Sequence, residues 1–281
     1  MSRSPLATVR ADYLPSQRFS HAIVALPTTD DEYLWLDPTL EGGRCGSLAR
    51  GLTGAPALIA DAVGGGYLTL PASDAARIRY IRDTVAIAED GSAETARRTV
   101  YSNASDMAGL RRRLEQESEV AVRRRHLQEL AADYPGVELL DFSVEGADAE
   151  ADSVVVTMRF RTPGRYSMAA DLLTGPLGDD AMISAELGRV VATPERPVPT
   201  DLRLIADHVV QVIDVELPVG WTLLSVPEPL ALEAGESRYR TEARAQGHTL
   251  VVKRDLEIGP QIIDIADYRE LGGFLNRVLQ D

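Results

Sequence analysis

The chain has 281 residues, of which 44% are hydrophobic and 26% charged, a balance typical of a globular protein with a sizeable core. Its formal net charge of -14 argues against capture of nucleic acid phosphates or of anionic lipid, so neither partner is expected. The single cysteine, Cys45, excludes an intrachain disulfide framework and a cysteine-rich zinc site, so apolar burial must hold the fold.

A β-hairpin is the first predicted element, over residues 20–36. An apolar run at 21–26 is broken by Pro-Thr-Thr-Asp-Asp at 27–31, and a second apolar run follows at 33–36. Runs of this length around a polar turn indicate two short antiparallel strands.

This hairpin brings a histidine and a carboxylate within reach of each other. If residues whose numbers sum to 58 pair, His21 lies directly opposite Asp37, and Ile23 lies opposite Trp35. Opposed side chains on one face have Cβ atoms about 4.5–5.5 Å apart. A carboxylate on one ring nitrogen fixes the tautomer and leaves the other to take a proton from a nucleophile. The spacing fits two-thirds of a catalytic triad, but on spacing alone a paired histidine without function is the more common case.

The next segment is rich in glycine up to Pro71, and a domain boundary is predicted near residue 72. The sequence therefore divides into an N-terminal part, 1–72, and a C-terminal domain, 73–281. In the latter, two strands at 78–89 and 93–101 are predicted to turn at Asp90-Gly91.

One long helix is predicted at about 105–133, where apolar residues recur at helical spacing until Pro135-Gly136. It is followed by strand-like runs and a closing helix at 265–279. The runs lie at 137–144, 154–160, 209–217, 221–225 and 249–258. The predicted fold class is mainly β (α+β), an antiparallel β-sandwich with one long and one C-terminal helix.

The motifs FSHAIVALP and YLWLDPT resemble the histidine and aspartate segments of the bacterial transglutaminase-like superfamily. The resemblance implies a partial papain-like core in residues 1–72, followed by a β-rich domain of unknown function. It assigns the catalytic histidine to His21 and the aspartate to Asp37. The distal segments ELPVGWTLLSVPEP and DYRELGGFLNRVL resemble the C-terminal domain of the same proteins, so the likeness extends along the chain.

Two positions depart from that family's pattern. Ser20 stands where the branch commonly has asparagine, a minor change because both side chains hydrogen-bond locally. The family's nucleophile is a cysteine at the start of a helix upstream of the histidine, and the 20 residues before His21 contain none. We therefore expect the chain to be a C-terminal fragment that lacks the nucleophile, completed by an upstream cysteine-bearing segment.

Cys45 is the alternative nucleophile. It follows both partners in the loop GGRCGS, so the family order of cysteine, histidine and aspartate is broken. Triads on unrelated folds do occur in other orders. An incidental loop thiol is the simpler interpretation, because the sequence shows no helix N-terminus or base beside it that would activate a thiol.

Other features of the sequence carry weaker signals. Arginine triplets at 111–113 and 123–125 alternate with glutamates on the predicted helix, which favours a solvated, ion-paired face over a nucleic-acid stripe. The remaining histidines, His126, His208 and His248, lack ligand-spaced partners, so no metal is expected. No cofactor is expected either. Trp35 is a candidate for the wall of an acyl pocket, or equally a core residue.

Two functions remain open from the sequence. In the first, a complete protein transfers acyl groups: a cysteine activated by His21 attacks a glutamine or other amide of a protein or peptide, and an amine or water resolves the thioester. In the second, residues 73–281 are a non-catalytic interaction or scaffolding module, and 1–72 is a remnant. The sequence does not decide between transfer and hydrolysis, and whether this chain is itself an enzyme stays open.

The compartment is also open. No run of about 18 apolar residues predicts a membrane span, and the N-terminus lacks the apolar core of a secretory signal. Proteins of the branch that the motifs resemble are often exported, which points to the periplasm or cell envelope for a parent protein.

Overall fold

The computed structural model describes most of the chain. The described residues are 21–28, 32–40, 45–46, 48, 52, 54–60, 66–71, 78–102, 104–148, 151–178, 182–183, 187–188, 190, 192–193, 199–202, 207–259 and 261–281. The predicted domain boundary near residue 72 lies outside them, as does Ser20.

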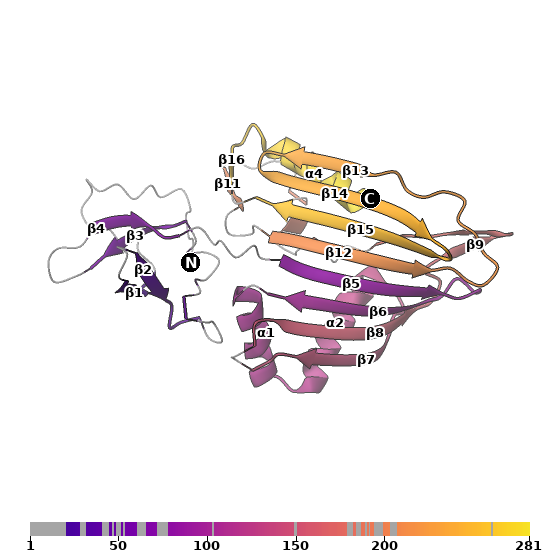
Figure 1. The fold of residues 1–281 in the computed structure, drawn as a ribbon, viewed down its shortest axis with the longest axis horizontal. Coiled ribbons are helices and arrows are strands. Elements are labelled where there is room, and N and C mark those ends of the chain that lie inside the picture. Colours follow the sequence, from indigo (N-terminus) through magenta and orange to yellow (C-terminus); the bar gives the residue numbers. More distant parts are fainter. Residues whose placement is uncertain are drawn as a thin grey trace.

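The N-terminal part contains two short hairpins, seen beside the larger body in Figure 1. β1 (Val24–Pro27) pairs antiparallel with β2 (Tyr33–Leu36), and β3 (Pro56–Ile59) pairs with β4 (Gly66–Thr69). The hairpin predicted from the apolar runs is therefore present.

Its register differs from the predicted one by one pair. Val24 pairs with Leu36 and Pro27 with Tyr33, so paired numbers sum to 60 and not to 58. The pair that closes the turn is Thr28 and Glu32, whose backbone N–H and oxygen are 2.8 Å apart. Adjacent pairs in an antiparallel ladder alternate between bonded and non-bonded, so this register puts Pro27, which has no N–H, at a non-bonded position.

The larger body is built on one eight-stranded sheet, in the order β13-β14-β15-β12-β5-β6-β8-β7. All neighbours are antiparallel except β12 and β5, which run parallel, so the sheet is mixed. Its strands are β5 (Ile78–Ile87), β6 (Ala93–Tyr101), β7 (Glu138–Glu145), β8 (Val154–Thr162), β12 (Asp207–Glu216), β13 (Leu230–Ala234), β14 (Ser237–Gln246) and β15 (Thr249–Ile258). Shorter pairs are β9 (Ser167–Ala169) with β10 (Leu172–Thr174), and β11 (Thr200–Asp201) with β16 (Ile262–Ile263).

The prediction of a single long helix at 105–133 is wrong. The structure has two helices there, α1 (Ala104–Gln116) and α2 (Glu119–Asp133). Ser118 separates them because its backbone is extended, with φ -68° and ψ 153°, and its hydroxyl accepts the N–H of Ala121. Such a serine begins a new helix and does not continue the old one.

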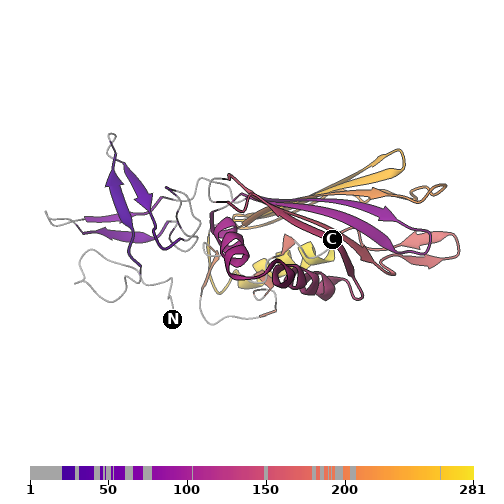
Figure 2. The same cartoon turned by 90° about the horizontal axis from the view of Figure 1, so that it is seen from below.

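Helices form the second layer of the fold. In Figure 2, α1, α2 and the C-terminal helix α4 (Tyr268–Gln280) lie on one side of the large sheet. Burial alternates along the strands accordingly: on β6, every second residue from Ala93 to Thr99 is buried and those between are exposed. The predicted mainly β (α+β) class with a C-terminal helix is confirmed, and helices, not a second large sheet, cover the buried face.

Three apolar clusters fill the space beneath the sheet. One joins α4 to β12, β14 and β15, with Leu271 and Leu275 among its fully buried side chains. A second joins α1 and α2 to β7 and β8 around Phe160, and a third packs Tyr166 and its neighbours under β5, β12 and β15. Burial of this apolar surface is the main stabilising term of the fold.

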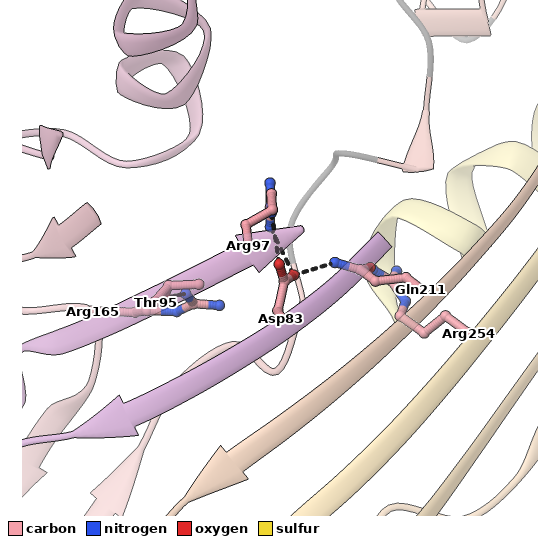
Figure 3. Close-up of polar contacts among 6 residues, drawn as sticks. All are labelled: Asp83, Thr95, Arg97, Arg165, Gln211 and Arg254. Carbon is pink, nitrogen blue, oxygen red and sulfur yellow. Dashed lines mark hydrogen bonds and ion pairs between the residues drawn. The ribbon is translucent and has the colours of Figure 1, made fainter. Parts of the chain in front are cut away.

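A buried polar network crosses the same face. Asp83 accepts Arg97 Nε on one carboxylate oxygen at 2.7 Å and Arg97 Nη2 on the other at 2.8 Å. Gln211 Nε2 donates to the second oxygen at 2.8 Å, and Arg254 Nη1 donates to Gln211 Oε1 at 3.4 Å. Figure 3 shows Asp83 between Arg97 and Gln211, with Arg254 beyond. Because Asp83 is only 2% exposed, this pairing offsets the cost of burying its charge.

Tyr239 continues this network to the end of α4. Its hydroxyl accepts Arg254 Nε at 2.9 Å and donates to Asp281 Oδ2 at 2.6 Å. Burial raises the pKa of Tyr239 to about 12, Asp281 adds to the rise, and Arg254 opposes it.

We expect Tyr239 to make the fold sensitive to alkali. Its folded-state pKa exceeds the unfolded value of about 10, so its contribution is complete below about pH 10 and lost as pH rises through about 12. The loss should be on the order of 2 kcal/mol in the free energy of unfolding. Denaturant titrations of wild type and Tyr239→Phe at both pH values measure it. Tyr239→Phe should show a shallower decline, whereas the control Tyr33→Phe, at an exposed ring, should match wild type.

Candidate functional site

The observed register keeps His21, Trp35 and Asp37 on one face of the β1–β2 hairpin. Side chains alternate between faces along a strand, and paired numbers here sum to an even value, so all odd-numbered residues of both strands share a face. The predicted and the observed sums, 58 and 60, are both even, so the difference in register does not change which residues share a face. Trp35 lies opposite Ala25, while His21 precedes β1 and Asp37 directly follows β2.

His21 and Asp37 are hydrogen-bonded, as the sequence predicts. His21 Nε2 lies 3.0 Å from Asp37 Oδ2, across a separation of 16 residues. The Asp37 side chain is 1% exposed, whereas 25% of the His21 side chain is exposed. A buried carboxylate thus supports a partly accessible imidazole, the arrangement that lets a histidine exchange protons with a bound group.

The carboxylate is held by a turn that begins at Asp37. Leu40 N–H bonds to Asp37 O at 3.1 Å, which closes a four-residue turn with Pro38 and Thr39 in its middle. Aspartate at the first position and proline at the second are the residues that such turns favour. Thr39 N–H donates to Asp37 Oδ1 at 3.1 Å, and Thr39 Oγ1 donates to the same oxygen at 2.7 Å.

These contacts keep Asp37 ionised. Burial alone would raise the pKa of the Asp37 carboxyl, but hydrogen bonds from Thr39 and His21, with the charge of His21, outweigh it and lower the pKa below its ordinary value. An ionised Asp37 accepts a hydrogen bond from the N–H of His21 Nε2. Nδ1 is then the ring nitrogen that can take a proton from a nucleophile.

Trp35 is buried, so its large ring anchors the hairpin. Its centroid lies 5.6 Å from that of Tyr33 at an interplanar angle of 46°. Both rings belong to the odd-numbered face, beside the His21–Asp37 pair along the same strand. This position suits either interpretation of Trp35, as a core anchor or as a pocket wall.

Cys45 is exposed and follows β2 in a turn. The next residue, Gly46, sits against Leu34: a Cβ built on Gly46 would lie 3.3 Å from Leu34 Cδ1. Leu34 is even-numbered and points away from the His21 face. Gly46, next to the exposed Cys45, therefore lies against the face of the hairpin opposite His21.

Two of the other histidines, His126 and His208, have side-chain partners as well. His208 Nε2 lies 2.9 Å from Asp255 Oδ1 on the open face of the large sheet, and His126 Nδ1 lies 3.1 Å from Glu129 Oε2. The ring of His126 is buried against Phe142, with centroids 5.1 Å apart. These contacts account for both side chains by packing and pairing within α2 and the sheet.

Two arginines of α1 and α2, Arg111 and Arg123, are less exposed than the sequence suggests. Arg125 bonds to Glu117 at 2.6 Å, as expected of an ion-paired face. Arg111 is 2% exposed, however, and donates to Ala151 O at 2.9 Å, while Arg123 donates to Leu139 O at 2.8 Å. The helix pattern places both side chains toward neighbouring strands and loops, whose free carbonyl oxygens they satisfy.

The C-terminal half of the sheet has a counterpart among known families. Residues 187–281 match DUF3858, a domain of unknown function with a solved structure. The DUF3858 region takes in β11 to β16 and α4, and does not include the hairpin that carries His21 and Asp37. Comparison with curated proteins and with solved structures gave no match.

Among the described residues, no helix combines the length and apolar character needed to cross a membrane. Likewise, no three or more His, Cys, Asp or Glu side chains of the described part are grouped so that they could hold a metal ion.

Thr39 is the site residue that sequence reasoning missed. Its signal was present in Asp-Pro-Thr, because an aspartate before proline often accepts hydrogen bonds from the residue two positions on.

Proposed function

We propose that His21 and Asp37 are the general base and the orienting carboxylate of a cysteine-dependent acyl-transfer site of the transglutaminase-like type. The observation that carries the proposal is the 3.0 Å contact between His21 Nε2 and Asp37 Oδ2. It is supported by the burial of the carboxylate beneath a partly exposed imidazole, and by the likeness of both segments to those of that superfamily.

The reaction divides into two acyl transfers. A cysteine thiol gives its proton to His21 Nδ1, and its sulfur attacks the carbonyl carbon of a glutamine side chain or another amide. The tetrahedral intermediate collapses when the carbon–nitrogen bond breaks and His21 returns the proton to the leaving amine, which leaves a thioester. A second amine, or water, then gives its proton to His21 and displaces the sulfur. Asp37 stabilises the imidazolium that forms in each step.

The nucleophilic thiol is the part of the proposed site for which residues 1–281 offer only a poorly placed candidate. Cys45 is the only cysteine in the sequence, and the adjacent Gly46 lies against the face of the hairpin opposite His21. The proposal therefore takes the nucleophile from a polypeptide segment other than these residues, reached from the exposed edge of the imidazole.

A scaffolding role for residues 78–281 is the second candidate. It is favoured by the buried network around Asp83, whose charged groups are bonded to one another beneath the sheet. Groups used in this way hold strands and helices together and do not meet a substrate. The two functions are compatible if the large sheet is the scaffold and the hairpin with His21 and Asp37 is the catalytic part.

The proposal is tested by supplying a thiol. The reading frame directly ahead of Met1 is examined for a cysteine at a predicted helix start, and that segment is fused to the chain. Amine incorporation into a glutamine-containing protein, and amide hydrolysis, are then measured. We expect activity in the fusion, and a loss of at least about 10³-fold in the fusion with His21→Ala, because triad residues act as a unit.

The unfused chain and its Cys45→Ala variant are the matched controls, and both should be inactive. Activity of the unfused chain that disappears in Cys45→Ala would identify Cys45 as the nucleophile and overturn the assignment. An upstream frame without cysteine, or a fusion whose activity survives His21→Ala, would also contradict it.

A further inference from the structure

We propose that Thr39 is a positioning residue of this site: it holds one carboxylate oxygen of Asp37 in the turn, so that the other oxygen faces His21. The placement of Thr39 follows from contacts within the hairpin and the turn after it. The effect of Thr39 on catalysis rests on the function proposed above.

The two oxygens of Asp37 have separate partners. Oδ1 accepts both the backbone N–H and the hydroxyl of Thr39, at 3.1 and 2.7 Å, and Oδ2 meets His21 Nε2 at 3.0 Å. The χ2 torsion of an aspartate, which rotates the carboxylate, has a broad range of allowed values. Two hydrogen bonds on Oδ1 stop that rotation and therefore aim Oδ2 at the imidazole.

Thr39 also faces the imidazole itself. Its Oγ1 lies 3.4 Å from His21 Nε2, and the hydroxyl hydrogen is already used in the shorter bond to Asp37. Oγ1 therefore presents a lone pair to Nε2, as Asp37 Oδ2 does. Both neighbours favour a proton on Nε2, which keeps Nδ1 available as the base.

The turn explains why threonine can do this. Pro38 fixes φ and lacks an N–H, so the first N–H after Asp37 is that of Thr39. The closure of the turn by Leu40 N–H fixes the direction of the Thr39 backbone. The hydroxyl then lies on the same side as the N–H, and the two donors converge on one oxygen.

A second threonine in the hairpin provides a matched control. Thr28 Oγ1 donates to the backbone oxygen of Glu32 at 3.0 Å, in the turn at the other end of the strands. Both hydroxyls stabilise a turn, but only that of Thr39 touches a carboxylate. A role limited to turn formation would make the two substitutions alike.

The test is a carbon-13 NMR titration of the Asp37 carboxyl in the chain of 281 residues. In wild type its midpoint should lie below the ordinary aspartate value, since Thr39 donors favour the charged form. Thr39→Val should raise the midpoint, Thr39→Ser should retain the wild-type value because serine keeps the hydroxyl, and Thr28→Val should leave it unchanged. Amide signals of Ala25 and Trp35 report whether the hairpin is intact.

A midpoint unchanged by Thr39→Val in an intact hairpin would overturn the proposal, and so would an equal rise in Thr28→Val. If the valine variant loses the hairpin signals, Thr39→Ala is used in its place. If that variant also unfolds, the wild-type midpoint decides: a value at or above that of an ordinary aspartate refutes the assignment.

In the thiol-bearing fusion, Thr39→Val should lower kcat about tenfold, the effect of one lost hydrogen bond to a charged group, with KM unchanged and with rescue by Thr39→Ser. An unchanged kcat would refute the catalytic part. An inactive wild-type fusion would count against the proposed function and not against the placement of Thr39, because the titration needs no activity.

Discussion

Replacing Asp83 by alanine should destabilise the protein by about 3–5 kcal/mol, the effect of breaking a buried ion pair by removing one partner. Arg97, which is 6% exposed, would lose the carboxylate that both its Nε and its Nη2 meet. Gln211 would lose the acceptor of its amide at the same time. Chemical denaturation of wild type and Asp83→Ala, followed by circular dichroism, measures the difference.

The opposite face of the same strands offers a matched control. Arg82 and Asp214 form an ion pair at 2.7 Å between β5 and β12, but 54% of the Arg82 side chain is exposed. Exposed pairs contribute about 0–1 kcal/mol, so Asp214→Ala should cost no more than that. Equal losses in Asp214→Ala and Asp83→Ala would show that burial does not set the cost.

A compensating pair of substitutions separates the effect of the lost charge from the effect of the lost side-chain volume. Asp83→Leu combined with Arg97→Met replaces the ion pair by apolar side chains, which is often neutral in other proteins. The double variant should therefore be more stable than Asp83→Ala. A double variant less stable than the single one would mean that the network contributes packing which apolar residues cannot replace.

Half of this network could be predicted from sequence. The alternation of β5 points Asp83 inward with Ile81 and Val85, and the Asp90-Gly91 turn sets the register that pairs Asp83 with Arg97. Both signals are local. Gln211 reaches Asp83 only because β12 runs parallel to β5, across a separation of 128 residues, and no local pattern announces that pairing.

Strand prediction failed where inward positions are polar or small. β14 was missed because its buried positions include Ser237 and Thr241, while arginines and a glutamate occupy exposed ones. Such a composition is not typical of a strand. The strand predicted at 221–225 is absent: Trp221 N–H bonds to Pro218 O in a turn. Apolar composition alone misled there, since none of residues 221–225 is buried and Leu224 is 83% exposed.

The candidate site was predicted more securely than its register. Parity requires only that the paired numbers have an even sum, so an error of one pair left His21 and Asp37 on one face. The turn at Asp37, which lies beyond the paired residues, then brought the carboxylate to the imidazole. Distance between side chains thus depended on the face and on the local turn, both of which short motifs encode.

In a fusion that carries the thiol, Asp37→Asn should lower kcat by up to about 10⁴-fold, the loss found when the orienting aspartate of a serine triad is replaced by asparagine. An asparagine amide can donate to His21 Nε2, which would put the proton on Nδ1 and remove the base. Because the pKa of Asp37 lies below its ordinary value, wild type should keep this function down to acidic pH, with no loss assignable to Asp37 near neutrality. Measurement of kcat against pH checks both points.

The matched control for this prediction is the second histidine–aspartate pair. His208 and Asp255 have the same contact, at 2.9 Å, on the open face of the large sheet. Asp255→Asn changes the same chemical group and should leave kcat unchanged, since that pair has no part in the proposed site. A comparable fall in Asp255→Asn would trace the loss to the fold. A fall confined to Asp37→Asn, together with the absence of activity in His21→Ala, would tie the reaction to the hairpin.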